Sequence, residues 1–240
     1  MKKHKQKSLK KLNIVALIPA RGGSKTIKAK NLYLLGSKPL LSWSIDAAKK
    51  EKIFNRIFVS TDNKNIAFYS KLYGAEVHHR PKKISQDYSL VSDTINNFIK
   101  HLRDELKYKI DILVLLEPTS PFREKNLIKN CISKMIIKKK DTIATFVKAE
   151  TDPKKVWDID NNGNPTAHYK KGAWLPRQKI ETNYELDGSV YAFNIINIKK
   201  IPKNLLFGKA TSMIRSSKDF VDINNIRDIN LAKTLLENKK

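Results

Sequence analysis

Short apolar runs alternate with amphipathic stretches along most of this chain. The apolar runs are rich in Ile, Val, Leu and Phe, a pattern typical of buried strands, and they cover residues 12–19, 56–61, 75–79, 111–116 and 142–147. Between them, apolar residues recur at helical spacing in residues 40–50, 63–73, 91–106 and 124–138. This alternation predicts an α/β fold in which a mostly parallel sheet is covered by helices on both faces. Ligands of such sheets bind beyond the carboxyl ends of the strands.

The pattern changes after Glu150. Residues 151–187 are dense in turn-forming Asp, Asn, Gly and Pro, with Trp157, Tyr169 and Trp174 between the turns. We predict a small β-hairpin arm, inserted into an α/β domain made of residues 12–150 and 188–240. A second subunit is the preferred cover for the aromatic side chains, so we expect a homodimer through the arm; a flap folded on its own domain is the alternative.

After the arm the chain returns to the sheet. We expect short strands at residues 188–193, 211–214 and 220–223, followed by a closing helix at 226–236.

The formal net charge of +25 raises the question of nucleic-acid binding. Of the 48 basic residues only eight are Arg, the residue that reads bases and clamps phosphates in bidentate fashion, and Lys-Lys pairs are scattered along the chain. The charge therefore indicates a basic surface, and we expect no specific nucleic-acid partner.

Residues 1–11 concentrate six Lys, which predicts a solvated, disordered tail. We do not interpret the tail and the next apolar run as a secretory signal, because Asn13 and Pro19 interrupt that run. No stretch has the roughly 18 apolar residues of a membrane span. A single cysteine, Cys131, excludes an intrachain disulfide and favours a reducing, cytoplasmic location; its helical spacing with apolar neighbours predicts a buried thiol.

A glycine- and cation-rich turn follows the first predicted strand. It reads Ala20-Arg21-Gly22-Gly23-Ser24-Lys25, with Lys28 and Lys30 close behind. Glycines allow close approach of backbone N–H groups to a ligand, and this density of cations suits a triphosphate. The turn matches neither a Walker loop nor GxGxxG, and composition alone leaves an ordinary surface turn as the alternative.

Two further predicted strands end in cationic or hydroxyl-bearing loops. Arg80 follows the third strand, with Asp87 after it, and Glu117-Pro118-Thr119-Ser120-Pro121-Phe122-Arg123 follows the fourth. Because carboxyl ends of parallel strands share one edge, these loops are expected to form one anion-binding rim.

Asp222 and Asn224 alternate near the end of the chain, which would place both on one face of a strand. Carboxylate and amide oxygens so placed suit Mg²⁺, which binds one or two carboxylates together with substrate phosphates. The alternative is a helix N-cap by Asn224 or Asn225.

These motifs resemble, in order, those of the acylneuraminate cytidylyltransferases, also called CMP-sialic acid synthetases. The resemblance covers residues 12–236 and rests on residues 18–25 with Lys30 and Asn31, then 60–62, Arg80-Pro81 with Asp87, 118–121 with Arg123, 176–178, 188–191 and 221–223.

The resemblance implies a Rossmann-like nucleotidyltransferase fold and transfer of CMP from CTP to the anomeric hydroxyl of an acidic 2-keto sugar. It implies catalytic roles for Arg21, Lys30 and Asp222, with Mg²⁺ held by Asp222 and Asn224. It implies that the nucleotide is bound by Ala20, Arg21, Gly22, Gly23, Ser24, Asn31, Arg80, Asp87 and Ser89. It implies that the sugar is bound by Glu117, Pro118, Thr119, Ser120, Arg123 and Asp187, and by Arg177 and Gln178 of the arm, which in this family reaches the neighbouring subunit's site.

Four residues depart from the family pattern. Asn224 stands at a usual aspartate, Glu117 at a usual glutamine, Thr26 at a usual glycine and Asp187 at a usual asparagine. An added carboxylate would repel an acidic sugar, so we expect Asp187 to face a hydroxyl, amide or ammonium group. We do not assume N-acetylneuraminate as the substrate: pseudaminate, legionaminate or another acylated nonulosonate fits equally well. An enzyme for an eight-carbon ulosonate, a CTP-binding homologue without turnover, and a basic nucleic-acid-binding protein remain the alternatives.

Overall fold

The computed structural model describes residues 12–169, 173–179 and 181–238, without the side chain of Arg177. The predicted disordered tail at residues 1–11 lies outside the described residues.

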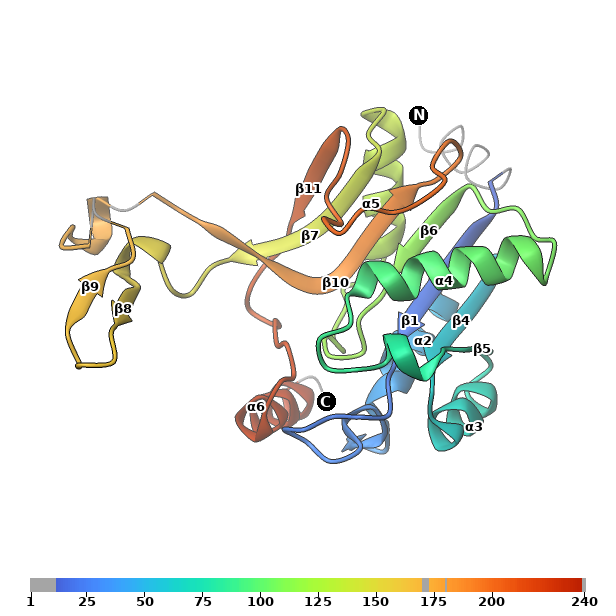
Figure 1. Cartoon of the computed structure of the whole chain (residues 1–240), viewed down its shortest axis with the longest axis horizontal. Coiled ribbons are helices and arrows are strands. Elements are labelled where there is room, and N and C mark those ends of the chain that lie inside the picture. The colour runs from blue at the N-terminus through green and yellow to red at the C-terminus, as the bar shows by residue number, and fades with distance from the viewer. Residues whose placement is uncertain (1–11, 170–172, 180, 239–240) are drawn as a thin grey trace.

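Within this part of the chain, a seven-stranded sheet forms the centre of the molecule (Figure 1). Its spatial order is β11 (Ala210–Ile214), β7 (Thr142–Lys148), β10 (Tyr184–Asn194), β6 (Ile112–Leu115), β1 (Ile14–Pro19), β4 (Arg56–Thr61) and β5 (Glu76–His79). β10 runs antiparallel to β6 and β7, while the other neighbouring strands pair in parallel. The predicted mostly parallel sheet is confirmed.

Helices cover both faces of the sheet because each turns an apolar stripe inward. On one face lie α2 (Leu40–Glu51), α3 (Lys64–Leu72) and α5 (Leu127–Ile137), whose buried residues pack with those of β1. On the other face lies α4 (Val91–Asp104), where Phe98 meets Phe58 edge to face at 5.0 Å between ring centroids. The predicted helices are thus present, with ends that shift by a few residues.

A smaller core attaches the carboxyl terminus to the first loops. It joins α6 (Ile226–Glu237) to a short hairpin of β2 (Leu34–Leu35) and β3 (Lys38–Pro39), and to Phe122 and Ile223. The prediction of a strand at residues 220–223 is wrong. This segment is irregular: it pairs with no strand of the described sheet, and Ile223 N donates instead to Thr119 O at 2.9 Å.

The inserted region extends away from the sheet as a small antiparallel hairpin (Figure 1). It contains β8 (Trp157–Ile159) and β9 (Pro165–Ala167), with short 3-10 turns at η3 (Pro153–Lys155) and η4 (Arg177–Lys179). Trp174 packs edge to face against Trp157 at 5.4 Å between centroids but remains 87% exposed. The chain then re-enters the sheet through β10, which begins at Tyr184 and continues past the predicted end of the arm.

β10 carries an irregularity where it passes the loop after β6. Its register with β7 shifts between Leu186 and Tyr191, and Gly188 adopts a φ of +67°. A Cβ atom at Gly188 would lie 2.7 Å from both Glu117 Oε2 and Ser120 Oγ, so only glycine fits here without rearrangement.

No helix in the described ranges has the length and apolar character needed to cross a lipid bilayer.

Candidate active site

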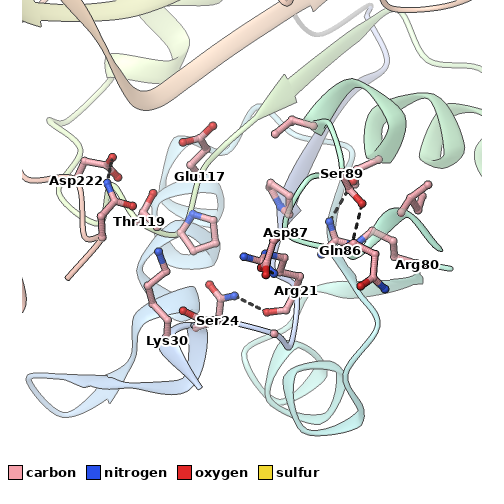
Figure 2. Close-up of a pocket in the computed structure, with 18 residues that line it drawn as sticks. Arg21, Ser24, Lys30, Arg80, Gln86, Asp87, Ser89, Glu117, Thr119 and Asp222 are labelled. Carbon is pink, nitrogen blue, oxygen red and sulfur yellow. Dashed lines mark hydrogen bonds and ion pairs between the residues drawn. The ribbon is translucent and has the colours of Figure 1, made fainter. Parts of the chain in front are cut away.

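A cavity of about 290 Å³ opens at the carboxyl ends of β1, β5 and β6 (Figure 2). The predicted residues that line it are Arg21, Gly23, Ser24, Lys30, Asn31, Arg80, Asp87, Ser89, Glu117, Pro118, Thr119, Asp222 and Asn224. The expectation that separate loops form one rim is therefore confirmed. Figure 2 shows Lys30, Glu117, Thr119 and Asp222 on one side, and Arg21, Arg80, Gln86, Asp87 and Ser89 on the other.

The loop after β1 is fixed by side chains from outside it. Asp62 Oδ1 accepts a hydrogen bond from Gly22 N at 2.9 Å, and Asn31 Nδ2 donates to Arg21 O at 2.9 Å. A Cβ atom at Gly22 would lie 2.8 Å from the Cβ of Asn63, which explains this glycine. Ala20 is fully buried and, like Gly22, supports the loop without lining the cavity.

Asp87 pairs with two cations of that loop. Its Oδ1 lies 2.5 Å from Arg21 Nη1, and its Oδ2 lies 2.7 Å from Lys25 Nζ. Hydrogen bonds from Lys25 and Arg21 lower the pKa of the Asp87 carboxyl. The contact joins the loop after β1 to the loop after β5 at the edge of the cavity.

Arg80 brings unpaired donors to the cavity. Its side chain is buried, and Nη1 donates to Thr94 Oγ1 at 3.0 Å, whereas Nε and Nη2 have no hydrogen-bond partner among the described residues. Burial lowers the pKa of the guanidinium group. Since buried donors are costly to leave unpaired, Arg80 is suited to a ligand that supplies acceptor oxygens, such as a nucleotide.

Lys30 and Thr26 attach the segment before α6 to the first loop. Lys30 Nζ donates to Ile223 O at 3.0 Å, and Thr26 Oγ1 donates to Asn224 O at 2.7 Å. Burial lowers the pKa of Lys30, and the nearby Asp222 charge opposes that shift. These bonds place Lys30 and Asp222 beside one another in the cavity.

The predicted metal-binding pair lies in contact. Asn224 Nδ2 donates to Asp222 Oδ2 at 2.6 Å, while Asp222 Oδ1 is buried and has no hydrogen-bond partner in the part of the chain that the structure describes. Among the described residues no group of three or more His, Cys, Asp and Glu forms a metal cluster. The orphaned carboxylate oxygen nevertheless suits Mg²⁺, because that ion takes most of its remaining ligands from water and phosphates.

The N-cap interpretation holds for Asn225, one of the two residues that it named. Asn225 caps α6 through Arg227 N and Asp228 N. Asn224 is therefore left to contact Asp222.

Glu117 carries the clearest electrostatic perturbation in the cavity. Burial, with a further contribution from the charge of Asp222, raises the pKa of its carboxyl to about 7. A carboxyl in this range changes protonation near neutral pH.

Several residues predicted for the sugar lie outside the cavity. Arg123 donates to Ser189 O at 2.8 Å, Glu117 O at 2.8 Å and Ser44 Oγ at 3.0 Å, and burial lowers its pKa to about 9. Ser120 Oγ donates to Asp187 O at 2.6 Å. Asp187 itself is 1% exposed, with its carboxylate directed at Thr145, Ser189 and Arg215.

Two arm residues were also predicted for the sugar. Gln178 is exposed in η4, and the side chain of Arg177 lies outside the described residues.

Sequence reasoning missed part of the lining, namely Pro19, Ile84, Gln86, Val91 and Thr94. Pro19 belonged to the recognised turn and could have been found there. Thr94 carries no local signal, because only the packing of α4 brings its hydroxyl to Arg80.

Comparison with known proteins identifies relatives over nearly the whole chain. A family model described as cytidylyltransferase matches residues 15–238. The CMP-N,N'-diacetyllegionaminic acid synthase of Legionella pneumophila is 31% identical over 94% of this chain and 97% of its own length. The pseudaminic acid cytidylyltransferase of Campylobacter jejuni is 26% identical over 92% of this chain and 95% of its own.

Two further matches are one partial sequence match and one solved structure. N-acylneuraminate cytidylyltransferase A of Danio rerio is 42% identical over 48% of this chain, which spans only 26% of that protein. A solved structure of CMP:2-keto-3-deoxy-manno-octonic acid synthetase complexed with CTP has a TM-score of 0.70 at 15% identity and covers 95% of this chain and all of its own. The resemblance stated from the motifs is confirmed, as is the fold that it implied.

Proposed function

The chain belongs to the cytidylyltransferase family, and on that premise we propose that it transfers CMP from CTP to the anomeric hydroxyl of a nonulosonic acid. The observation that carries this proposal is Arg80, whose buried Nε and Nη2 lack partners in a cavity that Arg21 and Lys30 also line. These donors and charges suit a nucleoside triphosphate. Two relatives matched over nearly their full length are named for legionaminic and pseudaminic acids, which supports the sugar class.

In the proposed reaction the anomeric oxygen bonds to the α-phosphorus as the bond from that phosphorus to the bridging oxygen breaks. Pyrophosphate leaves with the bridging oxygen, and the hydroxyl proton passes to a base. The demand on the protein is mainly positioning and neutralisation of charge. Arg21 and Lys30 meet that demand from the chain between β1 and β2, and Arg80 from the loop after β5.

We propose that the reaction depends on Mg²⁺, held by Asp222 with Asn224 beside it. Bound there, the ion would neutralise phosphate charge and polarise the α-phosphate. Asn224 orients the Asp222 carboxylate through its amide donor and leaves Oδ1 for the ion.

We further propose that the enzyme is a homodimer through the arm and acts in the cytoplasm. The exposed Trp174 and Ile159 of the arm support the dimer, because side chains of this kind are usually covered. The supply of CTP and the single cysteine support the location.

The test is pyrophosphate release from CTP and Mg²⁺ with a panel of nonulosonic acids and an eight-carbon ulosonate. We expect release with at least one nonulosonic acid and its loss in Asp222→Ala. Release should be retained in Glu105→Ala, because Glu105 is an exposed acidic residue at the C-cap of α4. Release only with the eight-carbon acid would replace the proposed substrate class. CTP binding without release from any acid would favour a binding protein without turnover.

A further inference from the structure

A buried ionic cluster lies directly behind the Glu117 side of the cavity. Arg215, whose side chain is 2% exposed, donates from Nη1 to Asp187 Oδ2 at 3.1 Å and to Ser189 Oγ at 2.6 Å. Its Nη2 donates to Phe122 O at 3.0 Å. One guanidinium group therefore joins the bulge of β10 to the loop between β6 and α5.

The Asp187 carboxylate is fully engaged by this arrangement. Oδ1 accepts from Thr145 Oγ1 and, at 3.1 Å, from Ser189 N, while Oδ2 accepts from Arg215. A buried carboxylate is stable only when it is paired and hydrogen-bonded. Arg215 supplies the charge that the added carboxylate at position 187 requires.

A second set of hydrogen bonds links the bulge of β10 to the residues that line the cavity. Arg123 donates to Ser189 O and Glu117 O, both at 2.8 Å, and Ser120 Oγ donates to Asp187 O at 2.6 Å. Glu117 N also donates to Gly188 O at 3.3 Å. The side of the cavity formed by Glu117, Pro118 and Thr119 is thus fixed to residues 187–189 at several points.

We propose that Asp187 and Arg215 are positioning residues that set the Glu117–Thr119 side of the cavity against the acidic sugar. This inference rests on the proposed function. It assigns Asp187 an indirect role in place of direct contact with the substrate, and it identifies Arg215 as a determinant of sugar recognition.

The nucleotide side of the cavity has different supports. Arg21 is held through Asn31 and Asp87, and Arg80 through Thr94; none of these contacts involves Asp187 or Arg215. Figure 2 shows Arg80 and Gln86 across the cavity from Glu117 and Thr119. Loss of the ion pair should therefore weaken use of the acid more than use of CTP.

The test is a double-mutant cycle in the full-length protein with Arg215→Met, Asp187→Asn and the double variant. Arg215→Met leaves a buried carboxylate unpaired, so we expect the largest fall in melting temperature and a rise of about tenfold in KM for the acid, with KM for CTP within about twofold. Adding Asp187→Asn removes that carboxylate charge and should recover most of both losses. Arg215→Lys keeps the charge and serves if Arg215→Met does not fold.

The matched control is the exposed pair Arg103 and Asp104, 2.7 Å apart, changed to Met and Asn in the same cycle. We expect its melting temperatures to be additive and its kinetics unchanged. Additive losses at 187 and 215, equal rises in KM for acid and CTP, or an unchanged KM for the acid would each overturn the inference. If the wild type releases no pyrophosphate with any acid, the proposed function fails instead. The melting temperatures of the variants at 187 and 215 then test the ion pair separately, and additive changes would contradict it.

Discussion

Gly188 shows how a single backbone conformation shapes the cavity. Its φ of +67° produces the bulge of β10, and the space that a Cβ would fill is taken by the Glu117 carboxylate and the Ser120 hydroxyl. Gly188 thus allows the bulge in β10 and leaves room for the side chains of the loop after β6. A side chain at this position would move either β10 or the residues that line the cavity.

We expect Gly188→Ala to lower the free energy of unfolding by about 3 kcal/mol, because it adds a steric clash to the cost of a left-handed backbone. Gly163→Ala isolates the backbone cost, since Gly163 has a φ of +84° with nothing within 4 Å of its Cβ position. That control should lose only about 1 kcal/mol. Urea denaturation measures both, and equal losses would show that the contact with Glu117 and Ser120 has no energetic weight.

The raised pKa of Glu117 predicts that the stability of the protein depends on pH. Its pKa is about 7 in the folded protein and near 4.5 when unfolded. Between these values the native state binds a proton that the unfolded state lacks, so the contribution of Glu117 to stability falls as pH rises through this window. The free energy of unfolding of Glu117→Gln, taken relative to that of wild type, should therefore rise from pH 5 to pH 8. Denaturation at both pH values measures this, with the exposed Glu237→Gln as the control that should show no such trend.

At the scale of elements, α6 positions the segment that carries Asp222. Asn225 and Asp228 form a capping box at its start, and Asp228 Oδ2 accepts from Asn224 N at 2.7 Å as well as from Asn225 N at 2.9 Å. The cap therefore holds the backbone of Asn224, whose side chain contacts Asp222. A helix terminus and the proposed metal site share the same few hydrogen bonds.

We expect Asp228→Ala to lower the free energy of unfolding by about 1 kcal/mol, as for other lost caps. Because Asn224 loses a backbone partner, the apparent affinity for Mg²⁺ should fall as well. Calorimetric titration with Mg²⁺ in the presence of CTP measures the second effect. Thr234→Ala, on the exposed side of α6, is the control; the same loss of affinity in both variants would contradict a specific role for the cap.

The sequence predicted the elements that repeat a local pattern and missed those that depend on distant partners. Strands and helices followed from apolar periodicity, and the loops after β1, β5 and β6 were recognised because they combine cations with turn residues. Residues 220–223 have strand-like composition, but they lie away from the sheet and form no ladder. Arg215 has no neighbouring motif, and its contacts with Phe122 and Asp187 come from residues 93 and 28 positions away.

At the scale of the whole molecule, the arm extends away from the sheet (Figure 1), and it exposes apolar side chains. Ile159 is 63% exposed and Trp174 is 87% exposed. A second copy of the chain is the cover that we propose for them.

We expect the wild type to sediment as a dimer at micromolar concentration, and the double variant Ile159→Ser with Trp174→Ala to dissociate, because it removes the apolar area buried on association. Phe68→Ser on α3 is a matched control, since Phe68 is 64% exposed but lies on the main domain. Sedimentation velocity over a concentration series measures the assembly. A monomeric wild type, or equal dissociation of the control, would contradict an interface on the arm.

The reversed direction of β10 has a consequence for how this protein could diversify. β7 ends at the edge of the sheet where the cavity opens, and β10 starts there, with Tyr184 opposite Lys148. Both attachment points of the inserted hairpin therefore lie at the edge of the sheet at which the cavity opens, while the loops that carry Arg21 and Arg80 follow β1 and β5, on the other half of the sheet. We therefore expect that exchanging the insertion with that of a homologue would change the association of protomers and the use of the acid, and would leave the use of CTP unchanged.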